Sequence, residues 1–288
     1  MTAFFTVFKF YLKRSLRDPM TIGFFFVLPL AMILLMTQLD FTAFNTPAEY
    51  DDYQYSQYED SQNEEQDESP FAHLDEEEIT VINNSFFIIV FGISFMFFAN
   101  EQLTYLIFDD IKGEMRWRQL AAPVTKGTFY VASTLVTWIV ILIQAVVVMG
   151  IPSLILDVYF GSPLIFFAAV FLVSLVSPLV ALIISQVAKT RKMGSAISQI
   201  LAFVFMFLAG VFMVPLGDSA LARFATNYGT PLSLALTAIQ YGGLSVVDEF
   251  TCMSTAWQRI GILAGVVVVL AALFAVIFNL KKSNKGAE

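Results

Sequence analysis

The side chains best suited to specific polar contacts lie at positions 109–127, between two long apolar runs. Glu114 and Arg118 are four residues apart, a spacing that lets them pair across one helical turn. Trp117 and Leu120 add apolar contacts beside this pair, and a proline and a glycine close the segment. The pattern predicts a short amphipathic helix, which either lies on a membrane surface or docks a soluble partner.

Patterns that mark catalysis or metal binding are missing from the sequence. The adjacent carboxylates Asp109 and Asp110 lack a further acidic partner, and His73 is the single histidine, with no second His or Cys for a metal site. Cys252 is the single cysteine, so no internal disulfide can form. The chain has no phosphate-binding loop, no H-E-x-x-H and no G-x-S-x-G. We therefore expect no catalytic residue, no metal site, no cofactor bound by this chain and no nucleic-acid partner.

The composition is that of an integral membrane protein. Of 288 residues, 57% are hydrophobic and only 14% are charged, and the mean hydropathy is +0.72. Apolar runs close to the ~20 residues that cross a bilayer recur along the chain without an alternating period, which predicts helices rather than a barrel. The expected fold is an all-α polytopic membrane protein, a single transmembrane domain over 1–288 with six transmembrane helices. These are expected at 21–39, 79–99, 128–150, 163–187, 195–215 and 258–279.

Basic residues predict the orientation of these spans. If both termini are cytoplasmic, all but Arg223 and Arg259 of the 16 Lys and Arg residues face the cytoplasm. The segment 109–127 is then cytoplasmic, whereas the loop 40–78, rich in Asp and Glu and without Lys or Arg, is extracellular. That loop either collects cationic substrates or divalent ions, or it is a solvated spacer.

A second amphipathic helix is expected at 1–18, before the first span. Aromatic and leucine side chains fall on one face, and basic side chains recur every four residues on the other. This pattern is typical of a helix lying in the membrane interface, with its basic face on anionic headgroups. The membrane-interface residues are Lys9, Lys13 and Arg17.

The order of these elements resembles the membrane subunits of type-2 ATP-binding-cassette (ABC) exporters. The residues that carry the resemblance run Leu-Ala-Ala-Pro-Val-Thr-Lys-Gly at 120–127, directly after the Glu-rich and Arg-rich helix. In that family a similar segment is the coupling helix, which docks in a groove of a separate ATPase subunit; the Gly-Thr-Leu usual upstream is missing here. The resemblance implies ATPase-coupling roles for Glu114, Arg116, Trp117, Arg118, Leu120 and Pro123.

A second match to the same family lies at 207–215 and 228–236. The run Tyr-Gly-Thr-Pro-Leu-Ser-Leu-Ala-Leu resembles the motif that opens the family's outer-leaflet helices. Thr230 can cap a helix that begins at Pro231 and stops at Gly242 and Gly243, which is too short to cross the bilayer. We therefore expect 216–257 to form short re-entrant helices on the outer side, between spans 5 and 6.

These features predict a permease that draws its energy from another chain. No Lys, Arg, Asp or Glu lies at the centre of an expected span, which argues against a proton relay. The resemblance implies two permease chains, alike or different, with two ATPase subunits that bind ATP and Mg, exporting a drug, peptide or lipid-like substrate across the plasma membrane. Two alternatives stay open: a stand-alone secondary transporter or channel, and a non-transporting membrane scaffold or immunity protein.

Deleting residues 49–68 separates the scaffold from the transporters. A scaffold that binds through its acidic loop loses its function with this deletion, whereas an exporter keeps export activity because its path and its docking helix are intact. Export and partner binding by the deleted and full-length chains are the measurements.

Overall fold

The computed structural model of the chain describes residues 2–38, 76–112, 126–156, 158–211, 220–244 and 249–285. Within these ranges the structure is helical and has no strand. A π-helical turn ends α5 and another lies inside the first long helical run. In chain order the elements are α1 (Thr2–Ser15), α2 (Pro19–Ile22), η1 (Gly23–Val27), α3 (Leu28–Gln38), α5 (Glu76–Leu106), η3 (Ile107–Lys112), α7 (Lys126–Ser153), α8 (Pro163–Val187), α9 (Arg191–Leu208), α10 (Ala220–Tyr228), α11 (Pro231–Leu244) and α12 (Glu249–Lys285).

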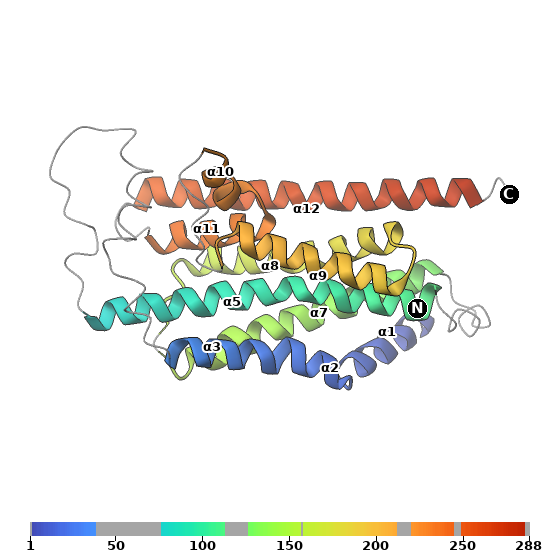
Figure 1. Cartoon of the computed structure of the whole chain (residues 1–288), viewed down its shortest axis with the longest axis horizontal. Helices are drawn as coiled ribbons and strands as arrows, with labels where there is room; N and C mark the ends of the chain where they lie inside the picture. The colour runs from blue at the N-terminus through green and yellow to red at the C-terminus, as the bar shows by residue number, and fades with distance from the viewer. Residues whose placement is uncertain are drawn as a thin grey trace.

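The long helices lie side by side and run in alternating directions along one axis (Figure 1). Helix α1, η3, the start of α9 and the last turns of α12 gather at one end of the bundle, which we call the basic end, and α10 and α11 lie at the other. Among the described residues, Arg223 lies in α10 and Arg259 in the first third of α12, whereas the other Lys and Arg residues lie in α1 and the turn after it, in η3, at the start of α7, at or just before the start of α9, and in the last turns of α12. The alternation of helix direction therefore gathers most of the described basic residues at one end of the bundle.

Five helices are long and apolar enough to cross a membrane: Ser85–Asp109, Gly127–Ser153, Pro163–Val187, Arg191–Leu208 and Met253–Leu280. The first of the six expected spans is not among them. Its residues form α2, η1 and α3, an unbroken helical run in which only the shorter stretch Phe25–Leu35 is strongly apolar.

The second span lies later in the chain than the sequence predicted. Its expected end was residue 99, whereas the described span ends at Asp109, and α5 already begins at Glu76, inside the expected acidic loop. The run Asn100, Glu101 and Gln102 lowers the local hydropathy, which hid the continuation of the helix. Leu103 and Ile107 beyond it are fully buried, so packing extends the helix past its polar positions.

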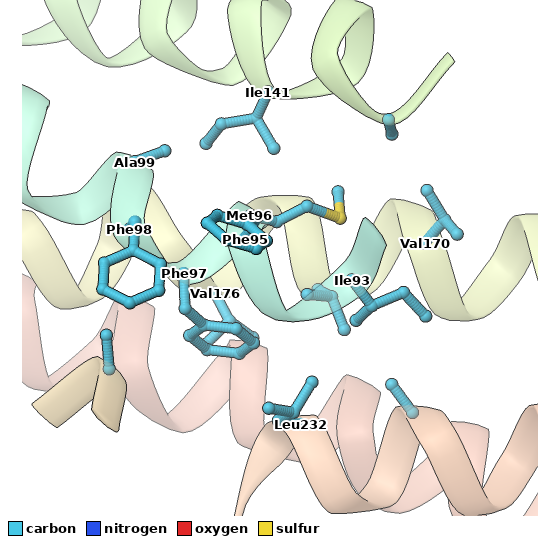
Figure 2. Packing of buried hydrophobic residues seen from close by; sticks show 14 of the residues in the cluster. Ile93, Phe95, Met96, Phe97, Phe98, Ala99, Ile141, Val170, Val176 and Leu232 are labelled. Carbon is cyan, nitrogen blue, oxygen red and sulfur yellow. The ribbon is translucent and has the colours of Figure 1, made fainter. Parts of the chain in front are cut away.

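The core of the bundle surrounds α5. Its apolar window is 83% buried, against 11% for α12 and 22% for α9. Figure 2 shows Ile93, Met96 and Phe97 of α5 among side chains from three neighbours, Ile141 of α7, Val176 of α8 and Leu232 of α11. Each buried large apolar side chain contributes roughly 1.5–3 kcal/mol in water-based bookkeeping; between helices in lipid the gain comes from close packing instead.

Glycines let α9 approach the end of α5, and let the loop before α8 approach α11. A Cβ at Gly194 of α9 would lie 2.8 Å from Cγ2 of Thr104 on α5 and 2.9 Å from Cε2 of Phe108 on η3. At the other end, Gly161 has φ +67° and a Cβ there would lie 2.6 Å from the Cα of Gly243. The glycine at 161 thus allows the loop before α8 to rest on α11.

Replacing Gly194 by Ala tests the α5–α9 contact against Gly265→Ala as the matched control, because a Cβ at Gly265 of α12 meets nothing within 4 Å. Both changes bring the same gain in helix propensity, so their difference isolates packing. We expect Gly194→Ala to be less stable than Gly265→Ala by about 1–3 kcal/mol. Thermal unfolding in mild detergent measures it, and equal midpoints would contradict the close approach.

Candidate functional site

The predicted docking residues lie in a segment that begins and ends at the basic end. Residues 113–125, and with them Glu114, Arg116, Trp117, Arg118, Leu120 and Pro123, lie outside the described residues. The structure describes both attachment points of this segment, η3 before it and the first turn of α7 after it. The candidate site is therefore built from the side chains that hold η3.

The π-helical turn η3 places Asp109 between two arginines. Arg191 Nη1, at the start of α9, lies 3.0 Å from Asp109 Oδ1, and Arg14 Nη2, near the end of α1, lies 3.8 Å from Oδ2. The Asp109 side chain is 25% exposed. One carboxylate therefore joins α1, η3 and α9, immediately before residues 113–125.

Further contacts hold Arg191 in position. Its guanidinium lies over the Tyr105 ring, 3.4 Å from the centroid, an arrangement that favours a cation on an aromatic face. Thr190 caps α9 by accepting a hydrogen bond from the Met193 amide at 3.2 Å. The first turn of α9 is thus fixed by its own cap and by the contacts of Arg191 with Tyr105 of α5 and Asp109 of η3.

A second polar contact fixes the turn between α1 and α2. Gln102 Nε2 on α5 donates to Ser15 Oγ at 2.8 Å and to Thr21 Oγ1 at 2.7 Å. Thr21 in turn donates to Asp18 Oδ2 at 2.9 Å. Helix α1 is therefore joined to α5 through Ser15 and to η3 through Arg14.

Glu101 lies outside the spans that the sequence predicts but inside a span of the structure. It lies within the described span Ser85–Asp109. Ser195 Oγ donates to Glu101 Oε1, and Gln199 Nε2 donates to Oε1 at 3.0 Å and to Oε2 at 2.9 Å. The span Ser85–Asp109 therefore carries a carboxylate eight positions before its end, while its central residue is Phe97.

The predicted membrane-interface residues are all exposed: Lys9 and Lys13 lie on α1, and Arg17 lies in the turn after it. The opposite face of α1 is not left entirely to lipid, since Tyr11 is buried and the helix packs on α7. Sequence reasoning missed Arg14 as an ion-pair partner: its type was visible in the basic cluster, but Asp109 lies 95 positions further along the chain.

Thr230 and Pro231 lie at the other end of the bundle. Thr230 Oγ1 accepts from the Ser233 amide at 3.0 Å, and Pro231 is the first residue of α11. Arg259 of α12 is buried beside them, with its guanidinium 3.6 Å from the centroid of the Tyr228 ring. The α10–α11 turn is thus held against α12 by a cation–π contact.

The fold and this site define a class of protein: a polytopic helical membrane protein whose polar contacts at one end link several helices to a segment between two spans. The described residues hold no group of three or more His, Cys, Asp or Glu that could bind a metal. The chain matches the ABC-2 type transporter family over residues 2–244, so it belongs to that family and is a membrane component of ABC transporters. No similar sequence was found among curated proteins.

The ion pair between Asp109 and Arg191 is testable with a double-mutant cycle of Asp109→Asn and Arg191→Gln. Because the Arg191 side chain is 48% exposed, we expect a coupling free energy of about 0.5 kcal/mol, reduced at high salt. Unfolding equilibria in detergent measure it. Pairing Asp109→Asn with Lys192→Gln, at the exposed neighbour, should give additive effects, and an equal coupling in both cycles would contradict the assignment.

Proposed function

We propose that this chain is the permease subunit of an ABC exporter, forms the path of the substrate and couples to a separate ATPase subunit through the segment 109–127. The family match supports a permease of this general kind. The ionic cluster at the start of that segment is the observation that carries the coupling role.

The ionic cluster would transmit movement of the segment mechanically. A docked segment that moves with the ATPase pulls on η3, and η3 carries Asp109, whose carboxylate contacts both α1 and α9. Glu101 and Thr104 extend the α5–α9 contact inward, since Thr104 Oγ1 and Ser198 Oγ are 3.3 Å apart. Displacement of the segment therefore moves α1, α5 and α9 together, and a small shift becomes a change in the bundle.

The proposed topology follows from the charges. Placing the basic end in the cytoplasm satisfies the positive-inside rule and makes both termini cytoplasmic, with the acidic loop and α10–α11 outside. The helical run 19–38 supports a sixth span, since 20 helical residues extend about 30 Å. In this orientation α1 is an interfacial helix, and α10 and α11 are the re-entrant outer helices.

The proposed assembly contains two permease chains and two ATPase subunits in the plasma membrane. ATP and Mg bind the ATPase subunits, whose closure drives the permease pair between inward-open and outward-open states. The substrate class is a drug, peptide or lipid-like molecule.

Replacing Arg116, Trp117 and Leu120 together by Ala tests the docking role. Arg and Trp dominate the binding energy of many interfaces, so we expect export to fall by about tenfold or more and ATP hydrolysis to lose its dependence on the permease. Proteoliposome export and ATPase assays are the measurements.

The control for this variant is the triple change of Lys9, Lys13 and Arg17 to Gln, which alters charge at the same end without touching the segment. It should keep ATPase coupling. Unchanged assembly and transport in the Ala variant would overturn the docking assignment, and transport in ATP-free liposomes under an ion gradient would favour a secondary transporter.

A further inference from the structure

Two carboxylates on one continuous helix, Glu101 and Asp109, have different partners. Asp109 faces two arginines, whereas Glu101 is contacted by the neutral donors Ser195 and Gln199. No lysine or arginine within the described part of the chain forms an ion pair with Glu101. Within the described residues, its charge is therefore oriented by hydrogen bonds and not balanced by an ion pair.

Glu101 lies deeper in the bundle than Asp109. The two residues are eight positions apart, which corresponds to about 12 Å along a helix axis, and Glu101 is inside the apolar span Ser85–Asp109. A carboxylate within a membrane span is costly without a partner, and such residues mark sites where an ion or substrate is handled.

The carboxylate retains capacity to accept another hydrogen bond or a cation. Among the described residues, Oε1 accepts from both Ser195 and Gln199, while Oε2 accepts only from Gln199, which leaves Oε2 with a further acceptor position. Gln199 is exposed, and α9 is only 22% buried over its apolar window, so the pair lies at an open side of the chain.

Aromatic side chains lie one helical turn away on both helices. Phe98 of α5 and Phe203 of α9 meet edge to face with ring centroids 5.4 Å apart, and Phe203 is 52% exposed. Ile200, next to Gln199, is 63% exposed. The open side of the α5–α9 seam thus presents a carboxylate beside an exposed aromatic and aliphatic surface.

We propose that Glu101, held by Ser195 and Gln199, binds the cationic group of a lipophilic cation, with Phe203 and Ile200 contacting its apolar part. This inference rests on the proposed function, because it names the substrate class of that permease. The neutral donors around Glu101, with no Lys or Arg partner among the described residues, carry the inference. A neutral ligand would leave the carboxylate without a counter-charge, and an anion would be repelled by it. Aromatic faces next to the carboxylate add cation–π attraction.

Binding of tetraphenylphosphonium and tetraphenylborate, two ions of the same shape and opposite charge, tests the site. The permease, purified with its ATPase in nanodiscs and without nucleotide, should bind the phosphonium at least about tenfold more tightly than the borate. Glu101→Gln should lose about tenfold of the phosphonium affinity, Glu101→Asp should keep the preference, and Ser198→Ala, a neutral change at the same seam, should leave it unaltered.

A second measurement needs no variant. A hydrophobic carbodiimide labels carboxyl groups within membranes, and the phosphonium, but not the borate, should protect Glu101 from labelling in the wild-type complex, read by peptide mass spectrometry. Equal binding of the two ions, full phosphonium affinity in Glu101→Gln, or absence of protection would each overturn the inference. So would a loss of permease pairing in Glu101→Gln with unchanged phosphonium binding, since the second chain would then supply the cation.

Failure of this site is distinguishable from failure of the proposed function. A complex that contains the ATPase and couples ATP hydrolysis to export, but binds the two ions equally, refutes only the substrate class. A permease that prefers the phosphonium but associates with no ATPase refutes the proposed function and keeps the site.

Discussion

Packing of α5 against its neighbours is the interaction on which the rest of the structure depends. Its apolar window is 83% buried, and α3, α7, α8, α9 and α11 all contact it, so each of them is placed by the face of α5 that it covers. Glycine at position 194 brings α9 near enough for the polar side chains of the two helices to meet. In a membrane, where apolar surface gains little by leaving lipid, such close contact and the hydrogen bonds it permits are the main sources of helix association.

Because α5 is central, the polar residues on its second half and on η3, which continues it, contact several elements at once. Gln102 holds the α1–α2 turn, Asp109 holds α1 and α9, and Thr104 meets Ser198 on α9. The same helix leads directly into residues 113–125. The coupling that we propose acts through this single continuous element, and it requires no contact between the segment and α9 or α1.

The two carboxylates of this continuous helix have different surroundings, and the surroundings give the same chemical group two different roles. Asp109 near the end of the span has arginine partners and is a structural junction, while Glu101 within the span has neutral donors that orient it. The burial of the other helices is graded: α9 and α12 leave most of their apolar windows open, at 22% and 11% buried. Those open surfaces are available to lipid, a substrate or another chain, and the α5–α9 seam carries the carboxylate of Glu101.

Composition and hydropathy alone determined that this is a helical membrane protein, and the basic residues determined which helix ends lie together, because hydrophobic length and charge asymmetry are local properties of the chain. The Pro-containing segments at 120–127 and 228–236 indicated the family that the whole-chain comparison then showed. Only the tertiary structure decided that the second span continues through Glu101 to Asp109, since Leu103 and Ile107 are stabilised there by neighbours distant in sequence. It also paired Asp109 with Arg14 and Arg191, 95 and 82 positions away, because ion pairs between helices depend on how the helices pack and leave no periodic trace in the sequence.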